Sequence, residues 1–135
     1  MTQAELNALA ELNALGTRVL DAAYNVHTEL GPGLLESAYL ACLAHELRHS
    51  GLDVKIEVPL PLVYQGIKLS EVGYRIDILI ENEIIVEVKS LETIAPVHVA
   101  QLVSYLKLSN RRLGYLINFN VDHLRDGIRR RLNKF

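Results

Sequence analysis

The stretch that decides the fold reads YRIDILIENEIIVEVKS and covers residues 74–90. Its isoleucines and valines fall into two apolar runs, which the polar triplet ENE at 81–83 separates. Short runs rich in β-branched residues, divided by a few polar residues, are typical of two strands joined by a turn. Four charged residues interrupt the apolar pattern, namely Arg75, Asp77, Glu87 and Lys89. Charged side chains inside apolar strands are the first candidates for a functional site.

The register of these two strands decides whether the charged residues meet. Side chains alternate between the two faces of a strand, so Glu87 and Lys89 share one face. If Ile80 pairs with Ile84 across the turn, Asp77 lies directly opposite Glu87, about 5 Å away at Cβ. A register shifted by one residue would instead place Asp77 and Glu87 on opposite faces.

Two facing carboxylates within an apolar sheet repel each other and lose hydration, which is unfavourable without compensation. A divalent cation supplies that compensation, and oxygen ligands suit magnesium or manganese. Lys89 would then orient a water molecule or balance developing phosphoryl charge. The same spacing also fits a buried cluster of ion pairs that joins Asp77 and Glu87 to Lys89 and Arg75.

The rest of the chain predicts helices and strands around this pair. The expected helices cover 17–30, 34–49, 96–108 and 122–132, the last with Asp122 as its N-cap. Strands are expected near 54–58, 62–64, 67–69 and 113–119, with a hairpin turn at Gln65-Gly66. Pro59 and Pro61 predict that the first strand is short or lies at an edge of the sheet.

This order predicts a single α/β domain over residues 1–135, with a helical lead-in at 1–15. An antiparallel meander followed by a β–α–β crossover implies a mixed β-sheet flanked by α-helices.

Three helical residues add to the candidate site. Glu36 falls on the apolar stripe of its helix, in the series Glu36, Leu40, Leu43 and Leu47, so it is expected to face the core. A first-turn glutamate that is favoured by the helix dipole explains the same position. Gln101 and Tyr105 share one face of the 97–108 helix, where they would bond the site's water, lysine or phosphate, or simply cover the sheet.

Composition narrows the class of protein. The formal net charge of −2 gives no general attraction to nucleic acid, although five basic residues crowd the last eleven positions. That basic cluster fits either a solvated face or a phosphate-contacting patch. The lone Cys42 suits a reducing cytoplasm, and no apolar run approaches the ~20 residues of a membrane span. The spacing of the five histidines predicts no zinc site.

Taken together, these residues resemble a known family. Asp77, then Glu87-Val88-Lys89, then Gln101-x-x-x-Tyr105 is similar to the PD-(D/E)xK nuclease superfamily, especially its RecB-like branch. The segment GLLESAY at 33–39 resembles the signature of the GxxExxY family, a small bacterial and archaeal group within it. The resemblance covers about Leu15 to Phe135.

The resemblance implies a restriction-endonuclease-like core, αβββαβ, with an extra N-terminal helix and a C-terminal helix. It implies hydrolysis of phosphodiester bonds in nucleic acid, DNA more than RNA, with Mg²⁺ or Mn²⁺. The implied residues are Asp77, Glu87 and the Val88 carbonyl as metal ligands, Lys89 for the attacking water, Glu36 for the ligand or water network, and Gln101 and Tyr105 in support.

A second class of function fits the same sequence. A non-catalytic nuclease-fold protein that acts as a scaffold in a larger DNA-processing complex agrees with the small size and the slightly negative charge. An enzyme that works as a homodimer or within such a complex is a third interpretation.

Overall fold

The computed structural model describes residues 1–134, with the exception of the side chains at 71 and 72. Phe135, the last residue of the expected domain, lies outside the described part. In chain order the elements are α1 (Gln3–Leu30), α2 (Glu36–His49), β1 (Val54–Tyr64), β2 (Ile67–Ile80), β3 (Ile84–Lys89), α3 (Pro96–Ser109), β4 (Leu113–Asn118), the 3-10 helix η1 (Leu124–Gly127) and β5 (Ile128–Leu132).

Within the described residues, the strands form one five-stranded sheet in the order β1-β2-β3-β4-β5. Neighbouring strands are antiparallel except β3 and β4, which are parallel. Parallel neighbours need a crossover connection, and α3 supplies it. The expected meander, crossover and mixed sheet are therefore confirmed.

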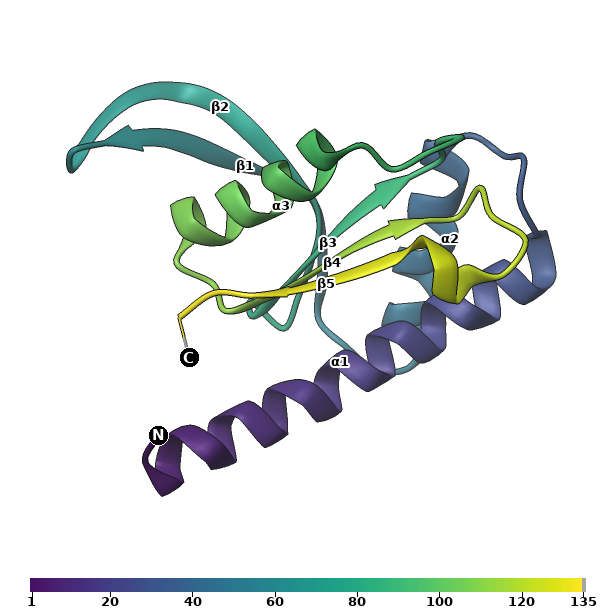
Figure 1. Cartoon of the computed structure of the whole chain (residues 1–135), viewed down its shortest axis with the longest axis horizontal. Coiled ribbons are helices and arrows are strands. Elements are labelled where there is room, and N and C mark those ends of the chain that lie inside the picture. Colours follow the sequence, from purple (N-terminus) through teal and green to yellow (C-terminus); the bar gives the residue numbers. More distant parts are fainter. Residues whose placement is uncertain (135) are drawn as a thin grey trace.

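Helices cover both faces of this sheet, as Figure 1 shows, with α1 and α2 on one side and α3 on the other. Ile78, Val86 and Tyr115 belong to the buried cluster that packs under α1 and α2. Leu79 and Ile85, which alternate with them along the strands, belong to the smaller cluster under α3. The alternation read from the sequence thus separates the two cores.

The C-terminal segment differs from expectation, because the final helix predicted for 122–132 is absent. Residues 128–132 instead form β5, which pairs antiparallel with β4 from Ile117↔Ile128 to Leu113↔Leu132. Leu124, Ile128 and Leu132 are spaced by four, and that spacing fits a helical period and a strand period equally. Every residue of β4 is buried. An unpaired β4 edge would leave its backbone groups without partners, so pairing decides in favour of the strand.

The first two strands are longer than the sequence indicates. β1 is an edge strand, as its prolines predict, but it spans 11 residues. β2 is one strand of 14 residues that joins the two segments expected separately. The hairpin turn at Gln65-Gly66 is confirmed, and both residues have positive φ. The outer part of this hairpin arches away from the sheet and over α3 (Figure 1).

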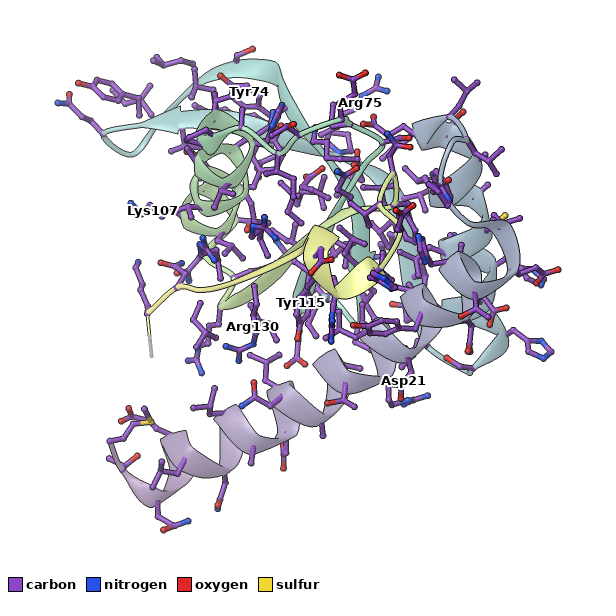
Figure 2. The ribbon with its side chains drawn as sticks, turned by 45° about the vertical axis from the view of Figure 1, so that its right-hand side comes forward. Asp21, Tyr74, Arg75, Lys107, Tyr115 and Arg130 are labelled. Atoms are coloured by element: carbon purple, nitrogen blue, oxygen red, sulfur yellow. The ribbon has the colours of Figure 1, made fainter. Side chains whose placement is uncertain are left out.

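The expected lead-in at 1–15 and the helix at 17–30 form one helix of 28 residues, α1. Gly16 lies in its middle because the helix approaches the sheet closely there. A Cβ at this position would collide with the hydroxyl of Tyr115, which extends from β4 toward α1 (Figure 2). Among the described residues, no helix combines the length and apolar character that crossing a bilayer requires.

Candidate active site

The candidate site lies where β2 separates from β3. The two strands pair from Ile80↔Ile84 to Ile78↔Val86, and the regular ladder ends there. Two residues beyond Val86, the Val88 N–H donates its hydrogen bond to the Asp77 side chain, with 2.8 Å between N and Oδ2. The predicted register is therefore confirmed over the paired residues, and Asp77 takes the place of a backbone acceptor just beyond them.

A sharp turn of β2 about its own axis explains why the ladder ends at Asp77. Ile78 packs in the core under α1 and α2, whereas Ile76, of the same strand parity, packs in the core under α3. Across β1, the residue that the register places opposite Asp77 is Glu57, whose φ of 51° lies in the left-handed region. A non-glycine residue in this region marks a local distortion of the strand. The distortion turns the outer hairpin over α3 and ends the β2–β3 ladder before Val88.

Glu87 is the most unusual ionisable residue of the site. Its side chain is only 3% exposed, and its Oε1 is buried without a hydrogen-bond partner among the described residues. Burial first, then the side-chain hydrogen bond with Asp77 and the negative charge of that residue, raise the pKa of Glu87 to about 10, although the Lys89 charge opposes the rise. The metal-free protein therefore holds a protonated Glu87 beside Asp77 at neutral pH.

The alternative cluster of buried ion pairs does not form. Among the described residues, no ion pair within 4.0 Å joins Lys89 to Asp77 or Glu87. Arg75 lies opposite Pro59 of β1, and its Nη1 is 4.0 Å from Glu57 Oε2 on an exposed surface. The register with Ile80 opposite Ile84, if continued, would place Arg75 opposite Lys89; Arg75 does not lie there, because β2 has left β3 before that position.

The donor set of the site fits a hard divalent cation. Lys89 O accepts a bond from β4 through the Phe119 N–H, so the Val88 carbonyl points to the opposite side, toward Asp77. The unpartnered Glu87 oxygen is a further ligand-type atom. The described residues contain no group of three or more His, Cys, Asp and Glu side chains that could hold a metal. Two carboxylates and one main-chain carbonyl resemble magnesium sites, in which water completes the coordination.

Helix α3 brings Tyr105 to this pair of carboxyl groups. Tyr105 is buried, and its pKa is raised to about 12, mainly by burial and then by the negative charges of Glu87 and Asp77 and by Tyr74. Gln101, one turn earlier, lines the same groove as Tyr105. His98 caps the start of α3, where its Nδ1 accepts from the Ala95 N–H at 2.8 Å.

Glu36 lies apart from these residues. It occupies the first turn of α2, and its side chain is exposed, so the expectation that it faces the core is wrong. The apolar stripe begins only after the first turn, with Tyr39 and Leu43 buried. The start of α2 nevertheless lies next to the end of β3, because the Ser90 hydroxyl donates to the Leu34 carbonyl at 2.6 Å.

Comparison with family models agrees with this geometry. The model described as the PD-(D/E)XK nuclease superfamily matches residues 13–131. The chain belongs to this superfamily. Its sheet and flanking helices accordingly form a restriction-endonuclease-like fold, and the expected fold class is confirmed except for the C-terminal helix. The comparison with curated proteins found no match, and neither did the comparison with solved structures.

Membership of the PD-(D/E)XK superfamily carries coarse functional implications. It implies a nuclease-type activity on a nucleic-acid substrate, and nucleases of this superfamily typically use divalent metals. The assignment to the smaller GxxExxY family stays a prediction.

Two asparagines that the sequence analysis missed hold the loops around the site of this PD-(D/E)XK fold. Asn118, buried at the end of β4, exchanges two hydrogen bonds with the backbone of Leu91, at 2.9 and 3.0 Å. Asn120 accepts from the Gly33 N–H at 3.1 Å and donates to the Leu91 carbonyl. Together they tie the segment after β3 to the segment before α2. The signal was available as two polar residues in INFN, at the end of an apolar strand.

Tyr39, the last residue of the GLLESAY segment, has a structural task in this fold. Its ring stacks on Phe119 with centroids 4.7 Å apart. Its hydroxyl donates to the Gly31 carbonyl at 2.6 Å and accepts from the Leu34 N–H at 3.1 Å. The tyrosine thereby fixes the loop that leads into α2 and to Glu36.

Replacing Tyr39 by phenylalanine tests this task. We expect Tyr39→Phe to lower the free energy of unfolding by about 2 kcal/mol, because the Gly31 carbonyl and the Leu34 N–H lose their partner near the protein interior. Urea denaturation measures the difference. Tyr24→Phe, which alters an exposed tyrosine on α1, serves as the control. Equal stability of both variants would contradict the assigned role.

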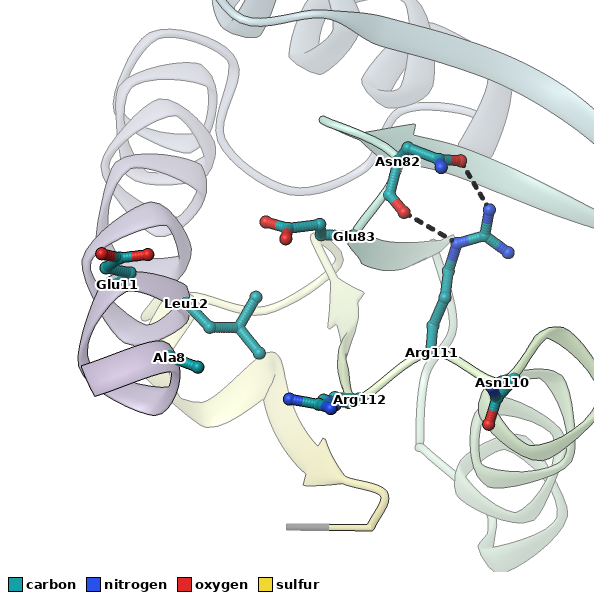
Figure 3. A pocket seen from close by; sticks show the side chains of 8 residues that line it. All are labelled: Ala8, Glu11, Leu12, Asn82, Glu83, Asn110, Arg111 and Arg112. Atoms are coloured by element: carbon teal, nitrogen blue, oxygen red, sulfur yellow. Dashed lines mark hydrogen bonds between the residues drawn. The ribbon is translucent and has the colours of Figure 1, made fainter. Parts of the chain in front are cut away.

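A second hollow lies at the far end of β3, where the β2–β3 turn faces the N-terminal half of α1 (Figure 3). Arg111 lines it and clamps the turn, because its Nη2 donates to Asn82 Oδ1 at 2.7 Å and its Nε donates to the Asn82 carbonyl at 3.1 Å. None of the predicted site residues of this PD-(D/E)XK chain lines that hollow. The role that the contacts of Arg111 show is to hold the β2–β3 turn.

Proposed function

We propose that this protein is a divalent-metal-dependent nuclease that hydrolyses phosphodiester bonds, in DNA more than in RNA. The observation that carries the proposal is the buried, unpartnered Oε1 of Glu87 beside Asp77. A buried polar atom without a partner is unfavourable. A structural role alone does not explain an acid there, but a ligand that binds and removes the proton from Glu87 does.

In this proposal Asp77, Glu87 and the Val88 carbonyl hold Mg²⁺ or Mn²⁺. When bound, the cation supplies positive charge that activates water and offsets charge on the phosphoryl oxygens. Lys89 is half-buried on the same strand as Glu87, and its charge already acts on that residue. We assign to its ammonium group the orientation of the attacking water and the stabilisation of the negative charge that grows on the phosphate.

Helix α3 supplies the remaining polar groups. The Tyr105 hydroxyl, whose raised pKa keeps it protonated, would donate a hydrogen bond to a phosphate oxygen or to water. Gln101 would support it from one turn away. Glu36, exposed near the end of β3, would reach the site only through water or substrate, so we assign it a place in the outer network.

The direct test is cleavage of linear and circular DNA and of RNA, with Mg²⁺, with Mn²⁺ and with a chelator. We expect cleavage that requires the cation and is abolished in Asp77→Ala, while circular dichroism shows a retained fold. Asp21→Ala, on the exposed surface of α1 (Figure 2), is the matched control. If the protein showed no cleavage and bound no divalent cation at millimolar concentration, the proposal would be ruled out.

The scaffold interpretation makes a different prediction in the same experiment. A non-catalytic protein would keep the binding of its partner in Asp77→Ala and would cleave nothing.

We place the enzyme in the cytoplasm, because its only cysteine, Cys42, has no disulfide partner in the chain. A homodimer would let two sites address two strands.

A further inference from the structure

A groove runs alongside the candidate active site, between the outer β1–β2 hairpin and α3. It has a volume of about 580 Å³, within the range of small-ligand sites. Figure 1 shows the hairpin arching over α3 on this side of the molecule. The hairpin exists in this position because β2 turns at Asp77, so one distortion creates both the carboxylate site and the groove.

Three tyrosines, Tyr64, Tyr74 and Tyr105, line the groove together with aliphatic side chains. Tyr64 at the hairpin tip is 61% exposed, and Tyr74 on β2 is 48% exposed. The ring of Tyr74 lies against Tyr105, with centroids 5.7 Å apart. Figure 2 shows Tyr74 above α3, from which Lys107 extends. Exposed aromatic rings beside a lysine are the elements of a surface on which nucleobases stack.

The groove and the candidate active site share a wall. Tyr105 and Gln101 line the groove, and Tyr105 packs in the same buried cluster as Ile85, two positions before Glu87. A strand that lies in the groove would therefore contact Tyr105, the residue of α3 that interacts electrostatically with Glu87 and Asp77. This continuity favours the substrate itself as the occupant of the groove.

The chemistry of the lining selects one form of nucleic acid. In a duplex the faces of the bases are stacked on one another, and only their edges reach the grooves. Unpaired bases offer their faces to aromatic rings. The net charge of −2 leaves little general attraction for phosphates, so stacking has to contribute a large share of binding.

We propose that this groove binds unpaired nucleotides of the substrate strand next to the scissile phosphate, by stacking bases on Tyr64 and Tyr74. The inference rests on the proposed nuclease function and narrows its substrate to nucleic acid with a single-stranded portion. The hairpin acts as a clamp over that portion, and Lys107 contacts its backbone.

A binding experiment without catalysis tests the groove. The chain contains no tryptophan, so Tyr64→Trp introduces a single tryptophan at the hairpin tip, which can be excited at a wavelength that tyrosine hardly absorbs. We expect a single-stranded oligonucleotide, added in the presence of a chelator, to quench its fluorescence. The same strand annealed into a blunt duplex, or made with abasic sites, should leave the fluorescence unchanged.

Affinity measured by fluorescence anisotropy supplies the second readout. We expect Tyr64→Ala to weaken binding of the single strand about 5- to 150-fold, the range for loss of one base–aromatic stack. Tyr24→Ala, which removes another exposed tyrosine, on α1, should leave the affinity within about twofold. Tyr64→Ala should have no further effect on an abasic strand.

Several results would overturn the groove assignment. Equal binding of duplex and single strand is one, and equal binding of abasic and normal strands is another. A fluorescence change that follows protein concentration alone would assign the groove to a second copy of the chain. Cleavage with an unchanged KM in Tyr64→Ala would reject the groove and leave the nuclease proposal standing. Binding of the single strand without cleavage in the presence of any metal would support the groove and reject the nuclease proposal.

Discussion

In the absence of metal, the Glu87→Gln variant should be more stable than the parent protein above pH 5, and the gap should widen as the pH rises. The pKa of Glu87 is about 10 in the folded chain, against 4.5 for the ordinary side chain. Between these values the unfolded chain releases a proton that the folded chain keeps, so the stability of the parent protein falls with rising pH. At 1.36 kcal/mol per pH unit, the loss attributable to Glu87 reaches about 3 kcal/mol at pH 7. Glutamine imitates the protonated acid and does not titrate.

Divalent metal should act in the opposite direction and close most of this gap at pH 7. A cation that binds only the folded state stabilises it by about 2.7 kcal/mol at 100 times its Kd. We expect Mg²⁺ or Mn²⁺ to raise the melting temperature of the parent protein, with release of a proton on binding. Glu87→Gln should respond little, because a neutral amide is a weak ligand.

Thermal denaturation from pH 5 to pH 9, with and without metal, measures both effects. Calorimetric titration in buffers of different ionisation enthalpy counts the released proton. Glu83→Gln, in the exposed β2–β3 turn, is the control and should behave as the parent protein does. If Glu87→Gln showed the same pH dependence as the parent, Glu87 would already be ionised in the folded chain, and the argument for a ligand site would lose its main support.

The second large effect should come from Lys89→Met, which keeps most of the length of the side chain and removes its charge. We expect kcat for cleavage to fall at least about 100-fold, the range for loss of one charged group that stabilises a transition state. Binding of metal should persist, because Lys89 is not among the proposed ligands. Loss of cleavage with retained metal binding would distinguish the role of Lys89 from that of Asp77, a proposed metal ligand.

Single-turnover cleavage at saturating metal gives the rate, and the metal-induced shift in melting temperature gives the binding. Lys55→Met, on the exposed edge strand β1, is the matched control. Asp77→Asn should lose both properties, since its carboxylate belongs to the ligand set. A cleavage rate in Lys89→Met within about threefold of the parent protein would remove Lys89 from the reaction.

The central strands could be predicted from the sequence because their signals agree. The triplet at 81–83 fixed a short turn, and a short turn between buried strands allows one register in which both apolar faces stay buried. That register brings Asp77 next to Glu87, although the ladder itself ends one residue earlier, at Ile78↔Val86. Tyr105 followed from its place on the inner face of α3.

Other features depended on partners that local patterns do not reveal. β5 is a strand because β4 has an open edge, and the spacing of its apolar residues is equally good for a helix. The strong turn of β2 at Asp77 depends on its twist and on the distortion at Glu57, which no residue type announces. The prediction that Glu36 faces the core was wrong because the first turn of α2 extends beyond the core that the rest of the helix covers. The helical spacing of Glu36 with the apolar residues therefore did not imply burial.

The turn of β2 gives this strand two mechanical roles. Its inner residues, Ile78 to Ile80, pair with β3 in the sheet. Its outer residues form, with β1, the hairpin over α3, here called the arm, and Asp77 lies at the junction of the two parts. Because Asp77 also holds the Val88 N–H, a load on the arm is transmitted to the backbone of β3 at the position of the carboxylates. If the groove binds a strand as proposed, capture of that strand under the arm would also align the ligand oxygens. An arm shortened between Tyr64 and Ile67 should loosen that alignment even though it leaves every ligand in the chain.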